Sequence, residues 1–277
     1  MLLSLSSSPD SFVQISILLA YYRLYGKIVS QYEPVLTKRF YHGRTEAMRT
    51  ATKPAVTFCQ TFVNPAASSS AKIEALQKAT QFHSKVVKEC AMGHGVERHL
   101  FALSCIADKF GFEQPKFFQS SSWKILNHTV LSTSNCGNPA LRLFGFGPVV
   151  PDGYGVGYII KDNSLSYSIA SKHRQTQRFA NMLESTLDDL QQLFLKSAIR
   201  FVDKPSTKSL QRNESSLSSQ PEYLDGMDFY GETTTTLPPP RRNSTKQDDD
   251  LFVGRTYKRE GTMEFQSLKN LDKLPES

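Results

Sequence analysis

Residues able to do chemistry are most concentrated between Tyr32 and Arg49. This segment, YEPVLTKRFYHGRTEAMR, places phenols, carboxylates, hydroxyls, a histidine and four cationic side chains around Gly43. A carboxylate enclosed by protein needs a guanidinium and hydroxyl donors to replace its water shell. The segment holds groups of both kinds, so it is the first candidate for the wall of a small-molecule site.

A second group of hydroxyls lies at Ser132-Thr133-Ser134. Side chains alternate along a strand, so Ser132 and Ser134 would point to the same face. Two hydroxyls on one face can line a reaction point, and a preorganised donor there stabilises a developing oxyanion. A serine-rich strand end is the plainer interpretation, because serine is common in this chain.

Histidine is the side chain that most often acts as a general base near neutral pH. The chain contains six: His42, His83, His94, His99, His128 and His173. The most suggestive surroundings are those of His42, in the run Tyr-His-Gly-Arg-Thr. We interpret it as a structural histidine bonded to a neighbouring carbonyl rather than as a base.

Composition narrows the classes of partner and cofactor. The net charge of +7 favours anionic partners such as nucleic acid, a membrane surface or a phosphorylated cofactor, and solvated surface charge explains it equally well.

The apolar run 12–22 is too short to span a bilayer, so no transmembrane segment is expected. No C-x-x-C pair is present, so free thiols are expected and no metal site is predicted. The cysteines are Cys59, Cys90, Cys105 and Cys136.

Hydrophobic periodicity predicts helices first and strands later. The helices are expected over 12–22, from Pro54 onward, over 73–87, 95–111, 117–125 and 175–201. Strands are expected over 129–133, 154–160 and 165–169, the last two joined by a turn at 161–164. Segment 32–49 is too irregular for either assignment.

Composition changes after Asp203, where serine, threonine, proline and charged residues dominate. Too little apolar surface remains there to offset the entropy of ordering, so residues 205–277 are predicted to form a disordered tail and 1–204 a folded domain. The run Pro238-Pro239-Pro240-Arg241-Arg242 could bind a protein of the SH3 kind weakly, although a solvated linker is the favoured interpretation.

Several patches, in this order along the chain, resemble the choline/carnitine acyltransferase family. They are Ser8-Pro9-Asp10-Ser11-Phe12, LAYYRLYG at 19–26, the segment 32–49, Glu97-Arg98-His99-Leu100, Ser132-Thr133-Ser134 and GPVVPDGYG at 147–155. Each patch alone is weak, whereas the ordered set is specific. The resemblance covers roughly residues 8–202.

The resemblance implies an α/β fold, the CoA-dependent acyltransferase fold, with a mixed sheet flanked by helices. Residues 1–204 would be the carboxyl-terminal part of an acyltransferase domain. In the family the active site lies in a tunnel between two similar domains, and this chain would supply mostly the second.

In this family the hydroxyl of carnitine attacks the thioester of acyl-CoA. The residues that match the family's carnitine-binding positions are Tyr32, Thr45 and Arg98, with Ser132 beside them. A trimethylammonium group cannot donate conventional hydrogen bonds, so an aromatic face is its natural partner. Phe146 stands where the family places such a ring.

The resemblance also assigns the reacting end of the site. Ser134 would donate to the developing oxyanion, and Asn135, where a glutamine is common, is the implied CoA contact. Phe144 stands where short-chain members have a bulky side chain and longer-chain members have glycine, so a short acyl group, acetyl foremost, is expected. If the match to the family were shifted by one residue, Gly145 would take this position and the acyl pocket would be open to longer chains. Acyl-CoA is expected as a co-substrate, and no permanently bound cofactor.

The family's catalytic histidine motif belongs upstream of every patch found here. The chain is therefore expected to be a carboxyl-terminal half that lacks its amino-terminal half and is inactive alone. The alternatives are a non-catalytic binding or regulatory protein and a medium- or long-chain member of the family. Nucleic acid is not an expected partner, and family members occupy mitochondria and peroxisomes.

Overall fold

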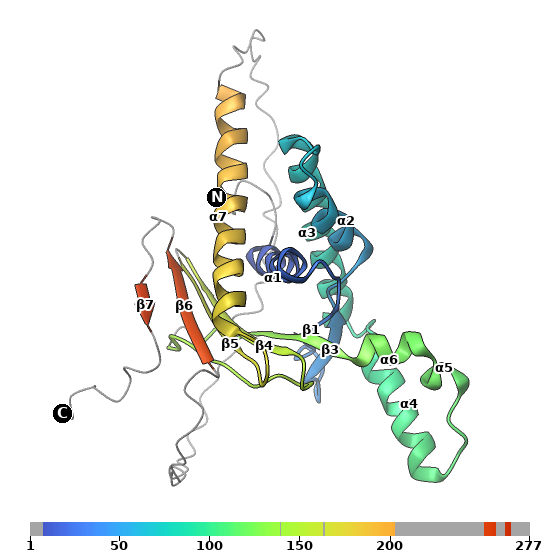
Figure 1. The fold of residues 1–277 in the computed structure, drawn as a ribbon. Coiled ribbons are helices and arrows are strands. Elements are labelled where there is room, and N and C mark those ends of the chain that lie inside the picture. Colours follow the sequence, from blue (N-terminus) through green and yellow to red (C-terminus); the bar gives the residue numbers. More distant parts are fainter. Residues whose placement is uncertain (1–7, 139, 163, 203–251, 259–263, 267–277) are drawn as a thin grey trace, which may run out of the picture.

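The computed structural model of the chain describes residues 8–138, 140–162, 164–202, 252–258 and 264–266 (Figure 1). Its centre is a seven-stranded sheet in the order β2-β1-β3-β4-β5-β6-β7. The strands are β1 (Ser30–Leu36), β2 (Thr45–Arg49), β3 (Thr129–Asn135), β4 (Tyr154–Lys161), β5 (Ser164–Ala170), β6 (Phe252–Lys258) and β7 (Glu264–Gln266).

The sheet is mixed. β1 pairs with β3 and β3 with β4 in parallel, whereas the β1–β2, β4–β5, β5–β6 and β6–β7 pairs are antiparallel. The helices are α1 (Pro9–Tyr25), α2 (Lys53–Val63), α3 (Ser69–Ala91), α4 (Glu97–Phe110), α5 (Lys116–Gln119), α6 (Ser121–Asn127) and α7 (Thr176–Val202). The mixed sheet with flanking helices confirms the predicted α/β class.

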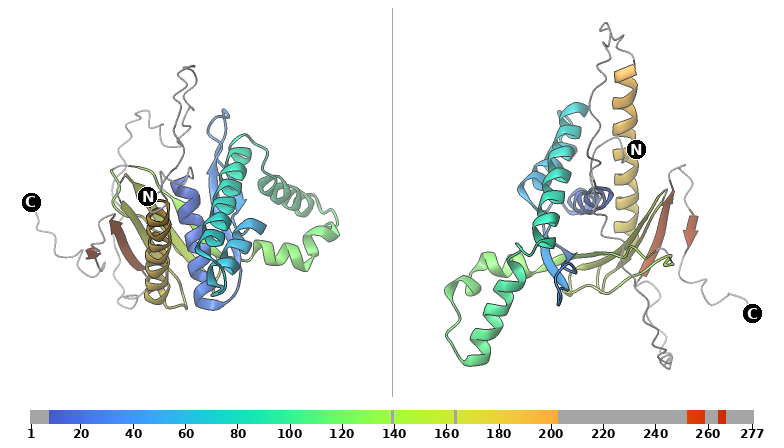
Figure 2. Two further views of the ribbon diagram at one scale, coloured as in Figure 1. Left: turned by 90° about the horizontal axis from the view of Figure 1, so that it is seen from above. Right: turned by 180° about the vertical axis from the view of Figure 1, so that it is seen from behind.

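Helix α1 forms the centre of the hydrophobic core. It begins with Pro9, whose missing N–H is no loss in a first turn, and ends at Gly26. Gly26 has a φ of 65°, a left-handed conformation that suits glycine. Most of the residues between are buried, and α1 packs against α3 and α7 on one side of the sheet (Figures 1 and 2). Among the described helices, none combines the length and apolar character needed to cross a bilayer.

Strands β1 and β2 form a hairpin in the segment that the sequence left unassigned. Gln31, Glu33 and Val35 alternate as the buried positions of β1. Two of these three are polar, so the strand lacks the apolar alternation by which strands are recognised. The turn is closed by Thr37 and Arg44, where the Thr37 N–H donates to the Arg44 carbonyl at 3.0 Å.

Strand register divides the side chains between two faces. The face that packs on α1, α3 and α7, here called the core face, includes Glu33 and Thr133, which hydrogen-bond to α3 and α1 respectively. The opposite face, here called the site face, carries Tyr32, Ser132 and Gly155, which are in register across β1, β3 and β4. The predicted site residues of β1 and β3 therefore point away from the helical layer.

A strip of chain, residues 144–147, crosses the site face directly over β4. A Cβ on Gly155 would lie 2.3 Å from the Phe146 carbonyl oxygen, and one on Gly157 would lie 2.5 Å from that of Phe144. Ser168 of β5 donates to the Phe144 carbonyl at 2.6 Å. The two glycines thus allow a backbone-to-sheet approach that any side chain would block.

Most predicted elements are confirmed. The six helical segments correspond to α1, α2, α3, α4, α5 with α6, and α7, and the three strands to β3, β4 and β5. The domain boundary at 204/205 stays a prediction. Within the expected tail, 252–258 and 264–266 are strands β6 and β7, so disorder is wrong for those segments. Backbone pairing of β6 with β5, and of β7 with β6, supplies the order that composition does not. The Pro-Pro-Pro-Arg-Arg run lies outside the described residues.

Replacing Gly155 by Ala should lower the unfolding free energy by about 1–3 kcal/mol, because the new methyl overlaps the Phe146 carbonyl. Gly147→Ala is the matched control, since a Cβ there meets nothing within 4 Å. Urea denaturation followed by circular dichroism measures both. Equal stability of the two variants would contradict the close approach of the strip to β4.

Candidate functional site

Tyr32, Thr45 and Arg98 meet on the site face at the edge formed by β1 and β2. One terminal nitrogen of Arg98 donates to the Tyr32 hydroxyl at 3.1 Å and to the Thr45 hydroxyl at 3.4 Å. Arg98 lies in the first turn of α4, where its backbone N–H donates to the Glu46 carboxylate at 3.0 Å. The structure therefore brings together three residues that are 13 and 53 positions apart in sequence.

A second arginine fixes α4 to the sheet and leaves Arg98 free to face outward. Arg49 forms a salt bridge with Glu97 at 2.9 Å and donates to the Thr129 hydroxyl at 2.8 Å, and both charged side chains are largely buried. Its guanidinium carbon also lies 5.9 Å from the Tyr32 ring centre. Arg49 is thus neutralised by a carboxylate.

Arg98 has no such counterion. Among the described residues its guanidinium hydrogen-bonds only to neutral oxygen atoms, the hydroxyls of Tyr32 and Thr45 and the Thr45 backbone carbonyl. Its side chain is exposed on the site face. A cation surrounded by hydroxyl groups and lacking an acidic partner is a suitable receptor for a carboxylate.

The two serines lie beside this cluster on the neighbouring strand. Ser132 pairs with Tyr32 of β1, and Ser134 follows two residues later on the same face. Ser132 is buried and Ser134 is half-buried. Asn135 at the end of β3 is exposed, and its amide donates to Asp10 at 3.2 Å. Since side chains alternate along β3, Asn135 points toward α1 on the core face, and the structure does not bring it together with the two serines on the site face.

The two aromatic candidates lie one strand further along the sheet. Phe144 and Phe146 belong to the strip over β4, and their ring centres are 6.1 Å apart. Both are half-buried. Because Gly155 and Gly157 are in register with Ser132 and Ser134, the strip runs alongside the two serines.

A buried polar network behind the site was not found from the sequence. His83 of α3 bonds to the Glu33 carboxylate at 2.7 Å and to the Ser11 hydroxyl at 2.8 Å. Asp10 hydrogen-bonds to Glu33 and accepts from Tyr158 at 2.6 Å. Only the burial of polar side chains marks these residues, and sequence periodicity does not show it.

The network keeps its acidic groups partly protonated near neutral pH. Desolvation raises the pKa of Asp10 to about 7, helped by the adjacent Glu33, and raises that of Glu33 to about 7. Burial lowers the pKa of His83 to about 4. The network therefore avoids several full charges inside the core.

Asp10, Glu33 and His83 also present ligand atoms within 4.8 Å of one another, a spacing that a metal ion could use. The atoms are, however, engaged with each other and with Ser11 and Tyr158 by hydrogen bonds. The arrangement is that of a proton-sharing cluster that ties α1 and α3 to the sheet.

No histidine in the described chain bonds to the cluster of Tyr32, Thr45 and Arg98. His42 is exposed on the hairpin turn with its ring 4.4 Å from that of Tyr41, rather than held by a carbonyl as expected. His128 pairs with Asp152 at 2.8 Å. The structure therefore does not bring any of the described histidines into hydrogen-bonding contact with the three predicted carnitine-binding residues.

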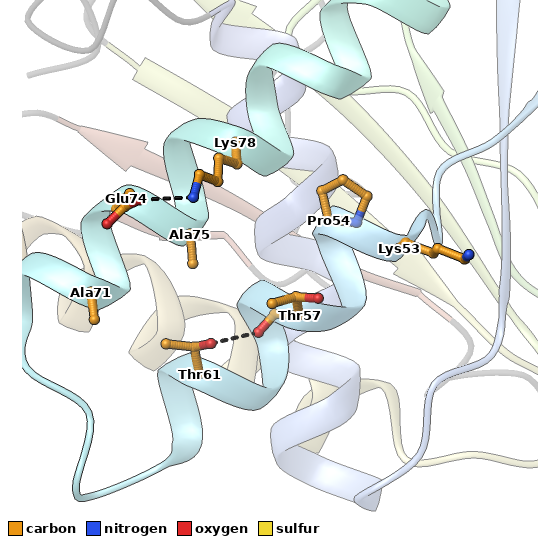
Figure 3. A pocket seen from close by; sticks show the side chains of 8 residues that line it. All are labelled: Lys53, Pro54, Thr57, Thr61, Ala71, Glu74, Ala75 and Lys78. Carbon is orange, nitrogen blue, oxygen red and sulfur yellow. Dashed lines mark hydrogen bonds and ion pairs between the residues drawn. The ribbon is translucent and has the colours of Figure 1, made fainter.

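A surface groove of about 440 Å³ lies between α2 and α3 (Figure 3). Its lining includes Lys53, Thr57 and the ion pair of Lys78 with Glu74, at 2.7 Å. None of the sequence-predicted site residues borders it. The groove therefore has no connection with the candidate site.

The acidic network predicts a characteristic pH dependence of stability. The folded-state pKa values of Asp10 and Glu33 are raised, so the folded chain binds extra protons and the unfolding free energy falls as pH rises through about 7. The lowered pKa of His83 has the opposite effect on stability: its contribution to the unfolding free energy is lost as pH drops from about 6.5 to about 4. The melting temperature should therefore fall by about 5 °C between about pH 6 and about pH 8.

Asp10→Asn mimics the protonated acid and should remove a large part of the fall in melting temperature between about pH 6 and about pH 8. Asp162→Asn, at an exposed position, serves as the control. The measurement is thermal denaturation at a series of pH values. An unchanged slope in Asp10→Asn would show that this carboxyl does not carry a raised pKa.

Comparisons of this chain with known proteins all point to the same family. A family model described as choline/carnitine O-acyltransferase matches residues 1–185. The protein named "Putative mitochondrial carnitine O-acetyltransferase" of Saccharomyces cerevisiae is 40% identical over 226 residues, which are 80% of this chain and 33% of that protein. Human mitochondrial carnitine O-palmitoyltransferase 2 is 37% identical over 186 residues, 66% of this chain and 28% of that enzyme.

The carnitine O-acetyltransferase of Rattus norvegicus is 33% identical over 190 residues, 67% of this chain and 30% of that enzyme. The chain thus spans about a third of the length of these relatives. The family match covers most of the described fold, including every residue of the candidate site. The chain belongs to the choline/carnitine acyltransferase family.

Proposed function

We propose that this chain forms the carnitine-binding wall of a carnitine O-acyltransferase. The observation that carries the proposal is the guanidinium of Arg98, which faces the site with two hydroxyls and no acidic partner among the described residues. The carboxylate of carnitine would accept hydrogen bonds from Arg98, Tyr32 and Thr45. These bonds would replace its hydration and fix one end of the molecule.

The rest of the site face suits the remaining groups of carnitine. We assign the trimethylammonium group to the ring of Phe146, whose π face attracts a cation that cannot donate conventional hydrogen bonds. Ser132 and Ser134 supply hydroxyls on the neighbouring strand. CoA would approach from the exposed end of β3, where Asn135 lies.

The reaction would be a direct transfer. A base removes the proton of the carnitine hydroxyl as its oxygen bonds to the thioester carbon, and the carbonyl oxygen becomes an oxyanion that accepts from Ser134. Collapse of this intermediate breaks the carbon–sulfur bond, and the CoA thiolate leaves and takes up a proton. The base would come from a part of the enzyme that faces this wall, since within the described residues no histidine bonds to the site residues.

We further propose that the acyl group is short. The similar proteins include both acetyl- and palmitoyltransferases, so the proposal rests on Phe144. Its backbone carbonyl lies close over Gly157 and accepts from the hydroxyl of Ser168, which holds this part of the strip against the sheet. A mitochondrial location, named for two of these relatives, is proposed for this chain as well.

Isothermal titration of the full chain with L-carnitine tests the binding wall. Arg98→Ala should weaken binding by on the order of tenfold to a hundredfold, the range expected for losing a charge-assisted hydrogen bond. Arg44→Ala removes an exposed arginine of the β1–β2 turn and should leave the affinity unchanged. Equal affinities in all three proteins would remove Arg98 from the site, and a folded chain that binds no carnitine would favour a non-catalytic role.

The acyl preference can be tested in a chimera that joins this chain behind the upstream two-thirds of the S. cerevisiae relative. The chimera should transfer acetyl groups far faster than palmitoyl groups, and Phe144→Gly should reverse the preference by opening the pocket floor. The chain alone, as control, should show no transfer. A chimera with unchanged preference after Phe144→Gly would place the acyl chain elsewhere.

A further inference from the structure

The two strands that carry the candidate site separate where the site begins. β1 and β3 are paired at Ser30, Gln31 and Tyr32, with a register irregularity after Ser30, and the ladder ends at the Tyr32–Ser132 pair. Pro34 follows two residues later and has no N–H to offer. Backbone pairing alone therefore does not fix the distance between β1 and β3 beyond this point.

A side chain takes over where the ladder ends. The hydroxyl of Thr133, which lies between the two serines but points to the core face, donates to the Tyr32 backbone carbonyl at 2.7 Å. This bond crosses from β3 to β1 directly behind the site. It ties the serine strand to the residue that contacts Arg98.

Gln14 of α1 holds Thr133 in this position. Its amide nitrogen donates to the Thr133 hydroxyl at 2.9 Å and to the Tyr158 hydroxyl at 2.8 Å, while its amide oxygen accepts from Gln31 at 2.7 Å. Gln14 is fully buried. One side chain thus connects α1 to β1, β3 and β4.

The Gln14 amide determines which group donates in each hydrogen bond of this network. A primary amide nitrogen carries two protons, and both are used on hydroxyl oxygens. Each hydroxyl must then turn its own proton away, Thr133 toward the Tyr32 carbonyl and Tyr158 toward Asp10. The amide oxygen accepts from Gln31 at 2.7 Å and also lies 3.2 Å from the Thr133 hydroxyl, whose bond to the Tyr32 carbonyl is the shorter one at 2.7 Å.

We propose that Gln14 is a positioning residue for the carnitine site, acting through Thr133 on the spacing and register of Tyr32 and the two serines. The inference rests on the proposed function only for what the site binds. Gln14 lies across the sheet from the site face and needs no contact with carnitine. An apolar residue of similar size would fill its volume but remove the hydrogen bonds that the Gln14 amide makes to Thr133, Tyr158 and Gln31.

The test compares Gln14→Leu, Thr133→Val and the double variant in the full chain. Ser16→Ala is the control, because Ser16 is also buried in α1 but bonds within the helix, to the Phe12 carbonyl at 2.7 Å. Carnitine affinity is measured by calorimetry well below each melting temperature, so that only folded protein is compared. Amide hydrogen exchange is followed in β1, β3 and β5.

Gln14→Leu and Thr133→Val should each weaken carnitine binding by about tenfold or more, and the double variant should be no weaker than the single ones, because both act through one bond. Exchange should quicken in β1 and β3 while β5 stays protected. Thr133→Ser, which keeps the hydroxyl, should retain the parental affinity. The control should change neither readout.

Two results would overturn the proposal. One is a folded Gln14→Leu chain with parental affinity and parental exchange in β1 and β3. The other is additive loss in the double variant, which would make the two residues independent. If the parental chain binds no carnitine, the proposed function fails, and the exchange pattern alone decides whether Gln14 positions β1 against β3.

Discussion

The junction between β1 and β3 is the constraint on which the rest of the structure depends. These two parallel strands carry Tyr32 and the two serines, yet their backbone ladder stops where those residues begin. The bond from the Thr133 hydroxyl to the Tyr32 carbonyl, with Gln14 of α1 donating to that hydroxyl, joins the strands where the ladder has ended. Such bonds add specificity because each buried polar group must find its partner, and only one arrangement of helix and strands satisfies them all.

The same need explains why the core contains so many polar groups. Gln14, Gln31, Glu33 and His83 are buried behind the sheet, where apolar side chains would pack with less risk of unsatisfied partners. Their bonds join α1 and α3 to the strands at defined points. On the other face, two arginines differ in their partners. Arg49 is neutralised by Glu97 and secures α4, whereas Arg98 bonds only to neutral oxygens among the described residues.

Sequence reasoning was most successful where one physical signal dominates. Hydrophobic periodicity alone predicted α1 and α7, although α1 begins at Pro9, earlier than the expected segment 12–22. The hairpin of β1 and β2 was not assigned, because the buried positions of β1 are partly polar and its pattern resembles a loop. The strands β6 and β7 were missed because their order comes from the pairing of β6 with β5 and of β7 with β6, and the contact with β5 is a long-range one that local composition does not contain.

The candidate site divides in the same way. Tyr32, Thr45 and Arg98 were chosen by resemblance, and the structure brings them into contact. Residues that support them from the far side of the sheet, Gln14 and His83 among them, carry no local signature and could be found only from coordinates. Asp10 was noticed as part of a motif, but its hydrogen bond to Glu33 depends on the packing of α1 against β1.

The central claim is that the Arg98 guanidinium and the hydroxyls of Tyr32 and Thr45 form a carboxylate receptor on the site face. A crystal structure of the chain with bound L-carnitine tests it most directly. The account predicts the carboxylate within hydrogen-bonding distance of all three side chains and the trimethylammonium group against Phe146. Carnitine bound with its carboxylate away from Arg98, or on the core face, would contradict it.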